Sequence, residues 1–278
     1  MNDQVVFWYG CNVLRHGDII HSALEVLRAA GIDPTPVGGP GYCCGSPKDA
    51  NLRAAEGMAV RTVEKFNVMP QGQLVTWCPS CHRHMGAFMT QYQEANFSTA
   101  HITQILHARR SQLAERMTQR VERRVVLHQH FGFHEVDVNP LVQDLLRIVP
   151  GIEVVASAHA SPGHMCSALA PVPEAMKDNT HRVCEAAREA QAQDVVTVFH
   201  SCQRLLCGLE ATEPFRVVNY ITVLAQALGY EHADEYKQWK NAGSVEAVEA
   251  LVGAERIERI GRERFEQVLP DILRKPAR

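Results

Sequence analysis

Leu74-Val75-Thr76-Trp77-Cys78-Pro79-Ser80-Cys81 is an apolar run that leads into a C-x-x-C pair. Its β-branched and aromatic residues predict a buried strand that ends at Cys78, with a helix beginning near Cys81. The same pattern returns 121 residues later as Val195-Val-Thr-Val-Phe-His-Ser-Cys202. A strand, a loop and a helix in the same order at two places in the chain indicate a duplicated α/β module.

The segments before residue 74 predict the other elements of the first copy. Residues 5–9 (VVFWY) predict a strand that ends at Gly10-Cys11. A helix is expected from about Asp18, which can serve as its N-cap, to Ala30. Residues 35–37 lead into a Gly- and Pro-rich loop over 38–47, and a second helix over about 50–66 follows. We therefore expect a parallel sheet flanked by helices.

The second copy keeps the same plan with different residues. Strands are expected over 125–127 and 152–156, before Gly132 and before the loop 161–166. The fold class is α/β, with two tandem β-loop-α modules that contain mainly parallel sheets. We predict modules over about 1–115 and 120–242, a charged helical linker near 108–124, and a helical tail over 243–278.

Composition narrows the function classes. The chain has 278 residues, a formal net charge of -3 and a pI near 6.5, which does not favour binding to nucleic acid. No apolar run approaches the roughly 20 residues that span a bilayer, and the N-terminus shows no signal peptide. Nine cysteines are an odd number, unlike a disulfide scaffold. We expect a cytoplasmic protein whose clustered cysteines are metal ligands or redox groups.

Five of the nine cysteines form one pattern: Cys11, Cys43, Cys44, Cys78 and Cys81, separated by 31, 0, 33 and 2 residues. Cys11 and Cys78 each follow an expected strand, and in α/β folds ligands bind outside the carboxyl ends of the strands. Five thiolates on one edge suggest a soft metal, foremost iron in an iron–sulfur cluster.

Other interpretations of these cysteines stay open from the residues alone. Single cysteines are commonly buried and unligated, and a Cys78/Cys81 pair could act as in thioredoxin, although that leaves three cysteines unexplained. A disulfide between adjacent Cys43 and Cys44 would be strained. Zinc is a serious alternative, since four thiolates make a structural site.

The pattern resembles the cysteine-rich CCG domain of the B-type subunit of heterodisulfide reductase. It is also similar to the iron–sulfur subunits of glycolate and lactate oxidases and of anaerobic glycerol-3-phosphate dehydrogenase. The motif Cys43-Cys44-Gly45, the run Cys78-Pro79-Ser80-Cys81 and residues 101–106 (HITQIL) carry this resemblance. The family usually contains two CCG copies, which fits the duplication over about 1–240.

The resemblance implies one noncubane [4Fe-4S] cluster held by all five cysteines, which would then be catalytic. It implies an oxidoreductase acting on sulfur groups, as the B-type component of a heterodisulfide reductase-like complex, with a disulfide, lipoate-bound or sulfane-sulfur substrate. The implied partners are an iron–sulfur protein of the C type and a flavoprotein of the A type from such a complex. We find no P-loop or dinucleotide glycine fingerprint in this chain. The alternatives are an electron-transfer subunit of a 2-hydroxyacid oxidase and a zinc-stabilised docking subunit.

The second copy departs from the CCG pattern. Gly132, His164, Met165 and Phe199 stand where the first copy has cysteines, and only Cys202 is retained. A second five-cysteine cluster is therefore excluded. The neighbourhood remains rich in candidate ligands, namely His128, His130, His134, His159, His164, Cys166, His200 and Cys207. A weaker second site of His164, Cys166, Cys202 and Cys207 is conceivable, and a degenerate copy kept for packing or partner docking is the favoured interpretation. A third interpretation is that the histidines line a substrate pocket beside the cluster and transfer protons.

Overall fold

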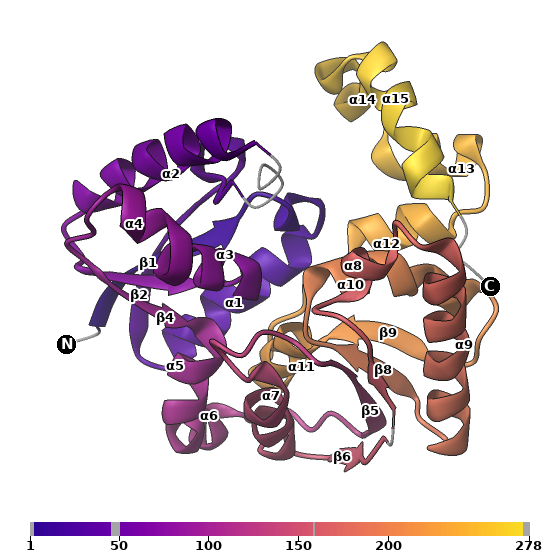
Figure 1. Ribbon diagram of the computed structural model, residues 1–278. Helices are drawn as coiled ribbons and strands as arrows, with labels where there is room; N and C mark the ends of the chain where they lie inside the picture. Colours follow the sequence, from indigo (N-terminus) through magenta and orange to yellow (C-terminus); the bar gives the residue numbers. More distant parts are fainter. Residues whose placement is uncertain (1–2, 46–50, 158, 275–278) are drawn as a thin grey trace.

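The chain forms two parallel β-sheets surrounded by helices, with a helical tail at the C-terminal end (Figure 1). The computed structural model describes residues 3–45, 51–157 and 159–274. The expected α/β class is confirmed, and every pairing between neighbouring strands in the two sheets is parallel.

The first sheet has the strand order β2-β1-β3-β4. Its strands are β1 (Asp3–Gly10), β2 (Ile32–Gly38), β3 (Gln73–Thr76) and β4 (Ser98–His101). Strand β1 is central, and its Val5–Trp8 stretch is buried on both faces, as expected for an inner parallel strand with a continuous apolar run.

Helices cover both faces of this sheet (Figure 1). They are α1 (Gly17–Ala29), α2 (Leu52–Asn67), α3 (Pro79–His84), the π-helical turn η4 (Met85–Met89), α4 (Thr90–Tyr92), α5 (Ile102–Ala108) and α6 (Arg110–Arg116), with short 3₁₀ turns η1 (Val13–Arg15) and η2 (Pro40–Tyr42).

The second sheet repeats the plan with the order β6-β5-β8-β9. Its strands are β5 (Arg123–His130), β6 (Ile152–Val155), β8 (Asp194–Thr197) and β9 (Arg216–Asn219), and the short β7 (Ala160–Ser161) pairs with the end of β5. The repeated order supports the duplication that the sequence predicts, while the exact boundaries of the modules stay a prediction.

The helices of the second half lie around this sheet and extend into the tail. They are α7 (Val138–Arg147), α8 (Cys166–Leu169), α9 (Pro173–Glu189), α10 (His200–Leu206), the turn η5 (Cys207–Ala211), α11 (Tyr220–Ala227), α12 (Glu235–Asn241), α13 (Val245–Val252), α14 (Ala254–Ile260) and α15 (Arg262–Leu273). No helix of the described residues is both long and apolar enough to cross a membrane.

One apolar core runs through both halves. Helix α1 packs against α11 and α5 against α7, so that buried residues from both sheets join a single cluster. A smaller core lies under α2 and η4 on the other face of the first sheet, around Trp8, Val63, Phe66 and Met85. The two halves are therefore one packed body.

Several sequence expectations differ from the structure. Asp18 lies inside the first turn of α1, and His16 occupies the N-cap position, because the chain enters the helix directly from η1. Residues 35–37, which lead into the expected loop, belong to β2. Strands β4 and β9 have no counterpart among the expected elements, and the described part of the tail, residues 243–274, holds three helices where one or two are expected. Residues 46–50, which include the end of the expected loop and the start of the expected second helix, lie outside the described residues.

Candidate metal centres

The five cysteines come from the carboxyl ends of three neighbouring strands. Cys11 follows β1, Cys78 follows β3, and Cys43 and Cys44 follow β2 and the turn η2. Strand β1 pairs with both β2 and β3. Because the ends of parallel strands meet at one edge of the sheet, the three loops converge there, and Cys81 joins them from the first turn of α3.

The five sulfurs form a connected set. The Sγ atoms of Cys11 and Cys43 are 3.7 Å apart. Cys43 also contacts Cys44, Cys44 contacts Cys81, and Cys81 contacts Cys78. A set of five thiols in contact has one ligand more than a tetrahedral zinc site needs.

The carboxyl end of the first sheet, where these five cysteines lie, is here called the rim and is partly open to solvent. Cys44 and Cys81 are buried, whereas Cys11, Cys43 and Cys78 are partly exposed. Gly10 has φ +81°, and a Cβ atom at this position would lie 3.5 Å from the Sγ of Cys81. A side chain at this position would therefore be in van der Waals contact with the Cys81 sulfur.

Protons are distributed unevenly over these thiols. The hydrogen bond to Cys43 raises the pKa of Cys11, and the same bond lowers the pKa of Cys43. The contact with Cys81 lowers the pKa of Cys78 to about 7, and the contact with Cys44 raises the pKa of Cys81. The pKa values thus alternate along the set, and a metal that binds there would displace the thiol protons.

Hydrogen bonds fix the loop that carries Cys43 and Cys44. The Thr62 hydroxyl donates to the carbonyl of Cys43 at 3.2 Å, and the Trp8 indole donates to the carbonyl of Tyr42 at 2.9 Å. Lys65 donates to the carbonyl of Gly41 at 2.7 Å and lies over the Tyr42 ring. These anchors come from β1 and α2, so the fold itself holds the loop at the rim.

A second group of ligand atoms lies in the other half of the molecule. His128 and His130 of β5, Cys166 of α8 and Cys202 of α10 are all buried, and their ligand atoms lie within 4.8 Å of one another. The Nε2 atoms of the two histidines are 3.1 Å apart. The Sγ atom of Cys166 lies 3.2 Å from Nε2 of His128 and 3.4 Å from Nε2 of His130. Cys202 contacts Cys166 and both rings.

The charges of this second group are set by burial and by mutual contact. Burial lowers the pKa of His128, which favours the neutral ring. Burial alone would raise the pKa of the Cys202 thiol, but contacts with Cys166, His128 and His130 bring it well below its usual value. Burial also raises the pKa of Cys166.

The structure brings together two members of the weaker second site that the sequence suggests, Cys166 and Cys202. It places His164 and Cys207 elsewhere: the Nδ1 of His164 lies 2.7 Å from the carbonyl of Gly132, and the Cys207 thiol faces the carbonyl of Arg204. His128 and His130 take their places in the group. The signal in the sequence is their spacing, because residues i and i+2 of a strand share a face.

The remaining candidate residues have other surroundings. His82 contacts the Thr76 hydroxyl at 3.2 Å, and His84 is buried near Cys43 and packs on Phe88. Cys184 is buried on α9. His200 accepts a hydrogen bond at 3.3 Å from the indole of Trp77, the residue before Cys78.

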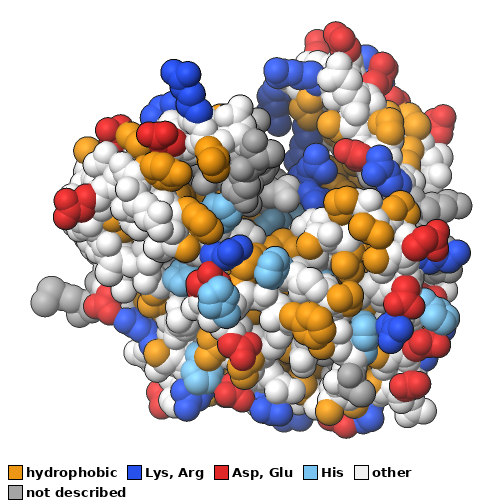
Figure 2. Space-filling view, viewed as in Figure 1, with side chains coloured by type: hydrophobic (Ala, Val, Ile, Leu, Met, Phe, Trp, Pro, Cys, Tyr) orange, Lys and Arg blue, Asp and Glu red, His pale blue; other side chains and the backbone are white. Residues whose placement is uncertain are grey.

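A basic pocket opens beside the loop of Cys11. Its volume is about 470 Å³, and its lining includes Arg15, Arg204, Lys240 and Arg274, with Asp271 as the acidic member. Arg204 also donates to the side chain of Asn12, next to Cys11, at 2.8 Å. Figure 2 shows Lys and Arg side chains along the hollow between the first half and the C-terminal helices. The pocket favours an anionic group near the rim.

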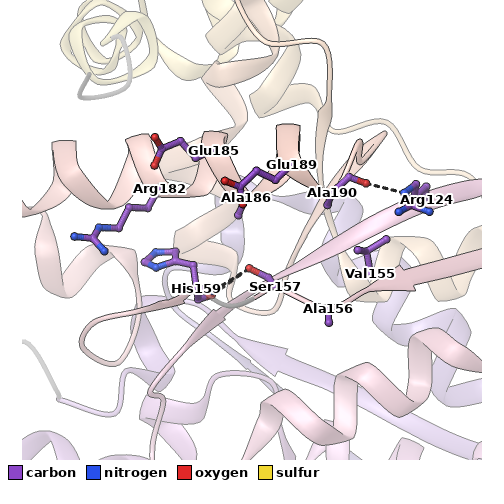
Figure 3. Close-up of a pocket in the computed structure, with 10 residues that line it drawn as sticks. All are labelled: Arg124, Val155, Ala156, Ser157, His159, Arg182, Glu185, Ala186, Glu189 and Ala190. Atoms are coloured by element: carbon purple, nitrogen blue, oxygen red, sulfur yellow. Dashed lines mark hydrogen bonds between the residues drawn. The ribbon is translucent and has the colours of Figure 1, made fainter.

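Another pocket lies between β6 and α9, and Figure 3 shows its lining. Its volume is about 410 Å³, and Arg124, Arg182, Glu185 and Glu189 give it charges of both signs. It contains His159 but none of the five cysteines and none of the second group of ligands. We therefore place the candidate chemistry at the two clusters and not in this pocket.

Comparison with known families agrees with this placement. Residues 5–86 match the family model described as CCG, cysteine-rich domain, and this segment contains all five cysteines of the rim. The match supports the CCG family for the N-terminal half. Together with the buried His/Cys group, it indicates metal or iron–sulfur binding.

Whole-chain comparisons add little. None of the curated proteins compared with this chain matches it. Among solved structures, an aspartate racemase homologue from Pyrococcus horikoshii OT3 aligns over 81% of this chain and 97% of its own, with 8% identity and a TM-score of 0.35. A likeness this low carries no argument about function.

Proposed function

We propose that this chain is a redox protein similar to the B-type subunit of heterodisulfide reductase, with one noncubane [4Fe-4S] cluster at the rim of the first sheet. The observation that carries the proposal is the convergence of five thiols from three adjacent strand ends. The proposed ligands are Cys11, Cys43, Cys44, Cys78 and Cys81.

The residues present fit such a group. Five sulfurs in contact at the ends of three adjacent strands suit an iron–sulfur cluster, which binds cysteines as thiolates. When bound, the cluster would supply iron sites for substrate sulfur and for electron exchange. The chain itself orients the thiolates through the anchors at Thr62 and Trp8.

The exposure of the rim supports sulfur redox chemistry over a purely electron-transferring role. Three of the five cysteines are partly exposed, so a small disulfide, a lipoyl group or a sulfane sulfur can reach the site. Arg15, Arg204, Lys240 and Arg274 line a pocket next to the Cys11 loop, and we propose that it holds a carboxylate or phosphate of the substrate. Cytoplasmic location and partners of the iron–sulfur and flavoprotein kinds belong to the same proposal.

The proposal is tested by titrating the anaerobic, oxidised protein with thiols and disulfides while following its electron paramagnetic resonance spectrum. We expect a new or shifted signal with dihydrolipoate or a related thiol, weaker in Arg204→Gln at the same thiol concentration. A cluster spectrum that no thiol, disulfide or persulfide alters would contradict sulfur chemistry and favour a purely electron-transferring role.

A further inference from the structure

The buried group in the second half has the arrangement of a mononuclear metal site. With metal–nitrogen and metal–sulfur lengths of about 2.0 and 2.3 Å, the ligand atoms of a tetrahedral zinc site lie about 3.3 to 3.8 Å apart. The distances from His128 Nε2 to His130 Nε2 and to Cys166 Sγ, 3.1 and 3.2 Å, are close to this range. A multi-iron cluster would hold some of its ligands much farther apart.

The hydrogen bond behind His130 orients its ring toward the group. Its Nδ1 lies 3.1 Å from the carbonyl oxygen of Pro162, which can only accept. Nδ1 therefore donates a hydrogen bond to this carbonyl, which leaves Nε2 facing His128 and Cys166. A carbonyl behind a ligating histidine is a recurrent feature of metal sites.

The group is closed to solvent and substrate. The four residues are between 0% and 4% exposed. The space beside His128 measures about 10 Å³, roughly the room for one water molecule. Asn179 directs its amide nitrogen at the Cys166 sulfur from 3.9 Å. Closed sites with four protein ligands are structural, whereas catalytic zinc keeps an open position.

We propose that His128, His130, Cys166 and Cys202 bind one Zn²⁺ ion in a closed tetrahedral site, which ties α10 to β5 and α8 of the second half. Cys202 belongs to α10, and the same helix carries His200, which contacts Trp77, and Arg204, which contacts Asn12. The ion thus fixes α10, the helix that contacts Trp77 and Asn12, and these residues are next to Cys78 and Cys11 in the sequence. This site is separate from the five-cysteine rim and does not depend on the function proposed for it.

The first test is zinc analysis of the wild-type protein with X-ray absorption at the zinc edge. We expect about one zinc per chain in a shell of two sulfurs and two nitrogens, and the same shell in Cys43→Ser. Absence of zinc, a different metal in its place, or a disulfide between Cys166 and Cys202 would overturn the proposal. A shell of four sulfurs would place zinc at the rim instead, which would overturn the proposed function as well.

The second test uses Cys202→Ser and the matched control Cys207→Ser, which removes a buried thiol outside the group. Zinc is expected to be lost in the first variant and kept in the second. Hydrogen exchange around Trp77 and Asn12 is expected to become faster only in Cys202→Ser. If Cys202→Ser binds zinc as the wild type does, or loses it with no change in exchange, the inference is wrong. Should this variant not fold, the spectrum of the wild type still decides.

Discussion

The two halves of this protein share a strand order but bring different ligands to the same end of their sheets. In the first half, Cys11 and Cys78 follow β1 and β3 into loops that leave the sulfurs partly exposed. In the second half, the histidines lie within β5 itself, and the group that they form is buried. Cysteines in the loops beyond the strand ends thus leave part of the first group exposed, whereas the histidines on the strand itself face the core.

The difference suggests how a duplicated module can divide its tasks. One copy keeps soft sulfur ligands at an accessible rim, which suits redox chemistry. The other copy has Gly132, Met165 and Phe199 at the corresponding positions and assembles its four ligands deeper in the fold. Because one apolar core joins the two halves, the buried group can stabilise the frame that carries the rim.

The largest expected effect concerns the rim alone. Cys43→Ser or Cys44→Ser removes a ligand from the middle of the sulfur set, and iron is expected to fall from about four atoms per chain to nearly none. Cys184→Ser, in the core of α9, is the control and should keep the wild-type iron content. Wild-type iron in both rim variants would refute the ligand assignment.

The next effect concerns the buried group. Cys166→Ser is expected to lower the free energy of unfolding by at least about 4 kcal/mol, because losing a structural metal is among the few causes of so large a change. Chemical denaturation with Cys184→Ser as the control measures it. Equal stabilities of the two variants would mean that the buried group does not support the fold.

A third prediction addresses the junction of the halves, where Asp18 and Asp234 approach the buried ring of His16. Burial, followed by the charge of Asp234, raises the pKa of Asp18 from 3.8 to about 7. The folded state thus binds a proton that the unfolded state releases between these values, so this carboxyl makes the protein less stable as the pH rises from about 4 to about 7.

Asp18→Asn removes that penalty. The free energy of unfolding of the variant should exceed that of the wild type by about 2 to 4 kcal/mol at a pH of about 8, and the two should be equal at a pH of about 4. Denaturation at the two pH values is the measurement. A difference that does not change with pH would show that Asp18 is ionised normally in the folded protein.

The smallest effect compares two glycines near the ends of the central strands: Gly10 is the last residue of β1, and Gly132 lies two residues beyond β5. Gly10 and Gly132 both have positive φ, so alanine at either should cost about 1 to 2 kcal/mol. Only at Gly10 would the added Cβ meet a sulfur, that of Cys81. Gly10→Ala should therefore lower iron content, and Gly132→Ala should leave it unchanged. Equal iron contents would show that the space above Gly10 is not needed.

Much of the fold can be predicted because its signals are local. The apolar runs over 5–9 and 74–77 predict β1 and β3, and the repeat at 195–202 predicts the second sheet. Strands β4 and β9 escape prediction because four-residue edge strands, such as the polar Ser98–His101, have too little pattern and are defined by pairing with β3 and β8. The sequence places the N-cap of α1 at Asp18 instead of His16, because the 3₁₀ turn η1, which directly precedes the helix, is not predicted.

The five-cysteine rim and the buried His/Cys group also differ in how far the sequence predicts them. The rim follows from cysteines that are placed at strand ends, so the order of the chain nearly specifies it. The buried group is only partly predictable from the sequence. The spacing of His128 and His130 places both on one face of a strand, but transferring the CCG positions by a fixed offset leads to His164. The path of the chain through β7 into α8 instead brings Cys166 to the histidines.

The most direct test of the central claim is the iron and acid-labile sulfide content of the anaerobically purified wild-type protein, with an electron paramagnetic resonance spectrum after mild oxidation. The account predicts about four irons and a matching amount of sulfide per chain, with a paramagnetic signal from the oxidised cluster. A protein that carries zinc at the five-cysteine rim and no iron would contradict the claim and make the first half a structural module.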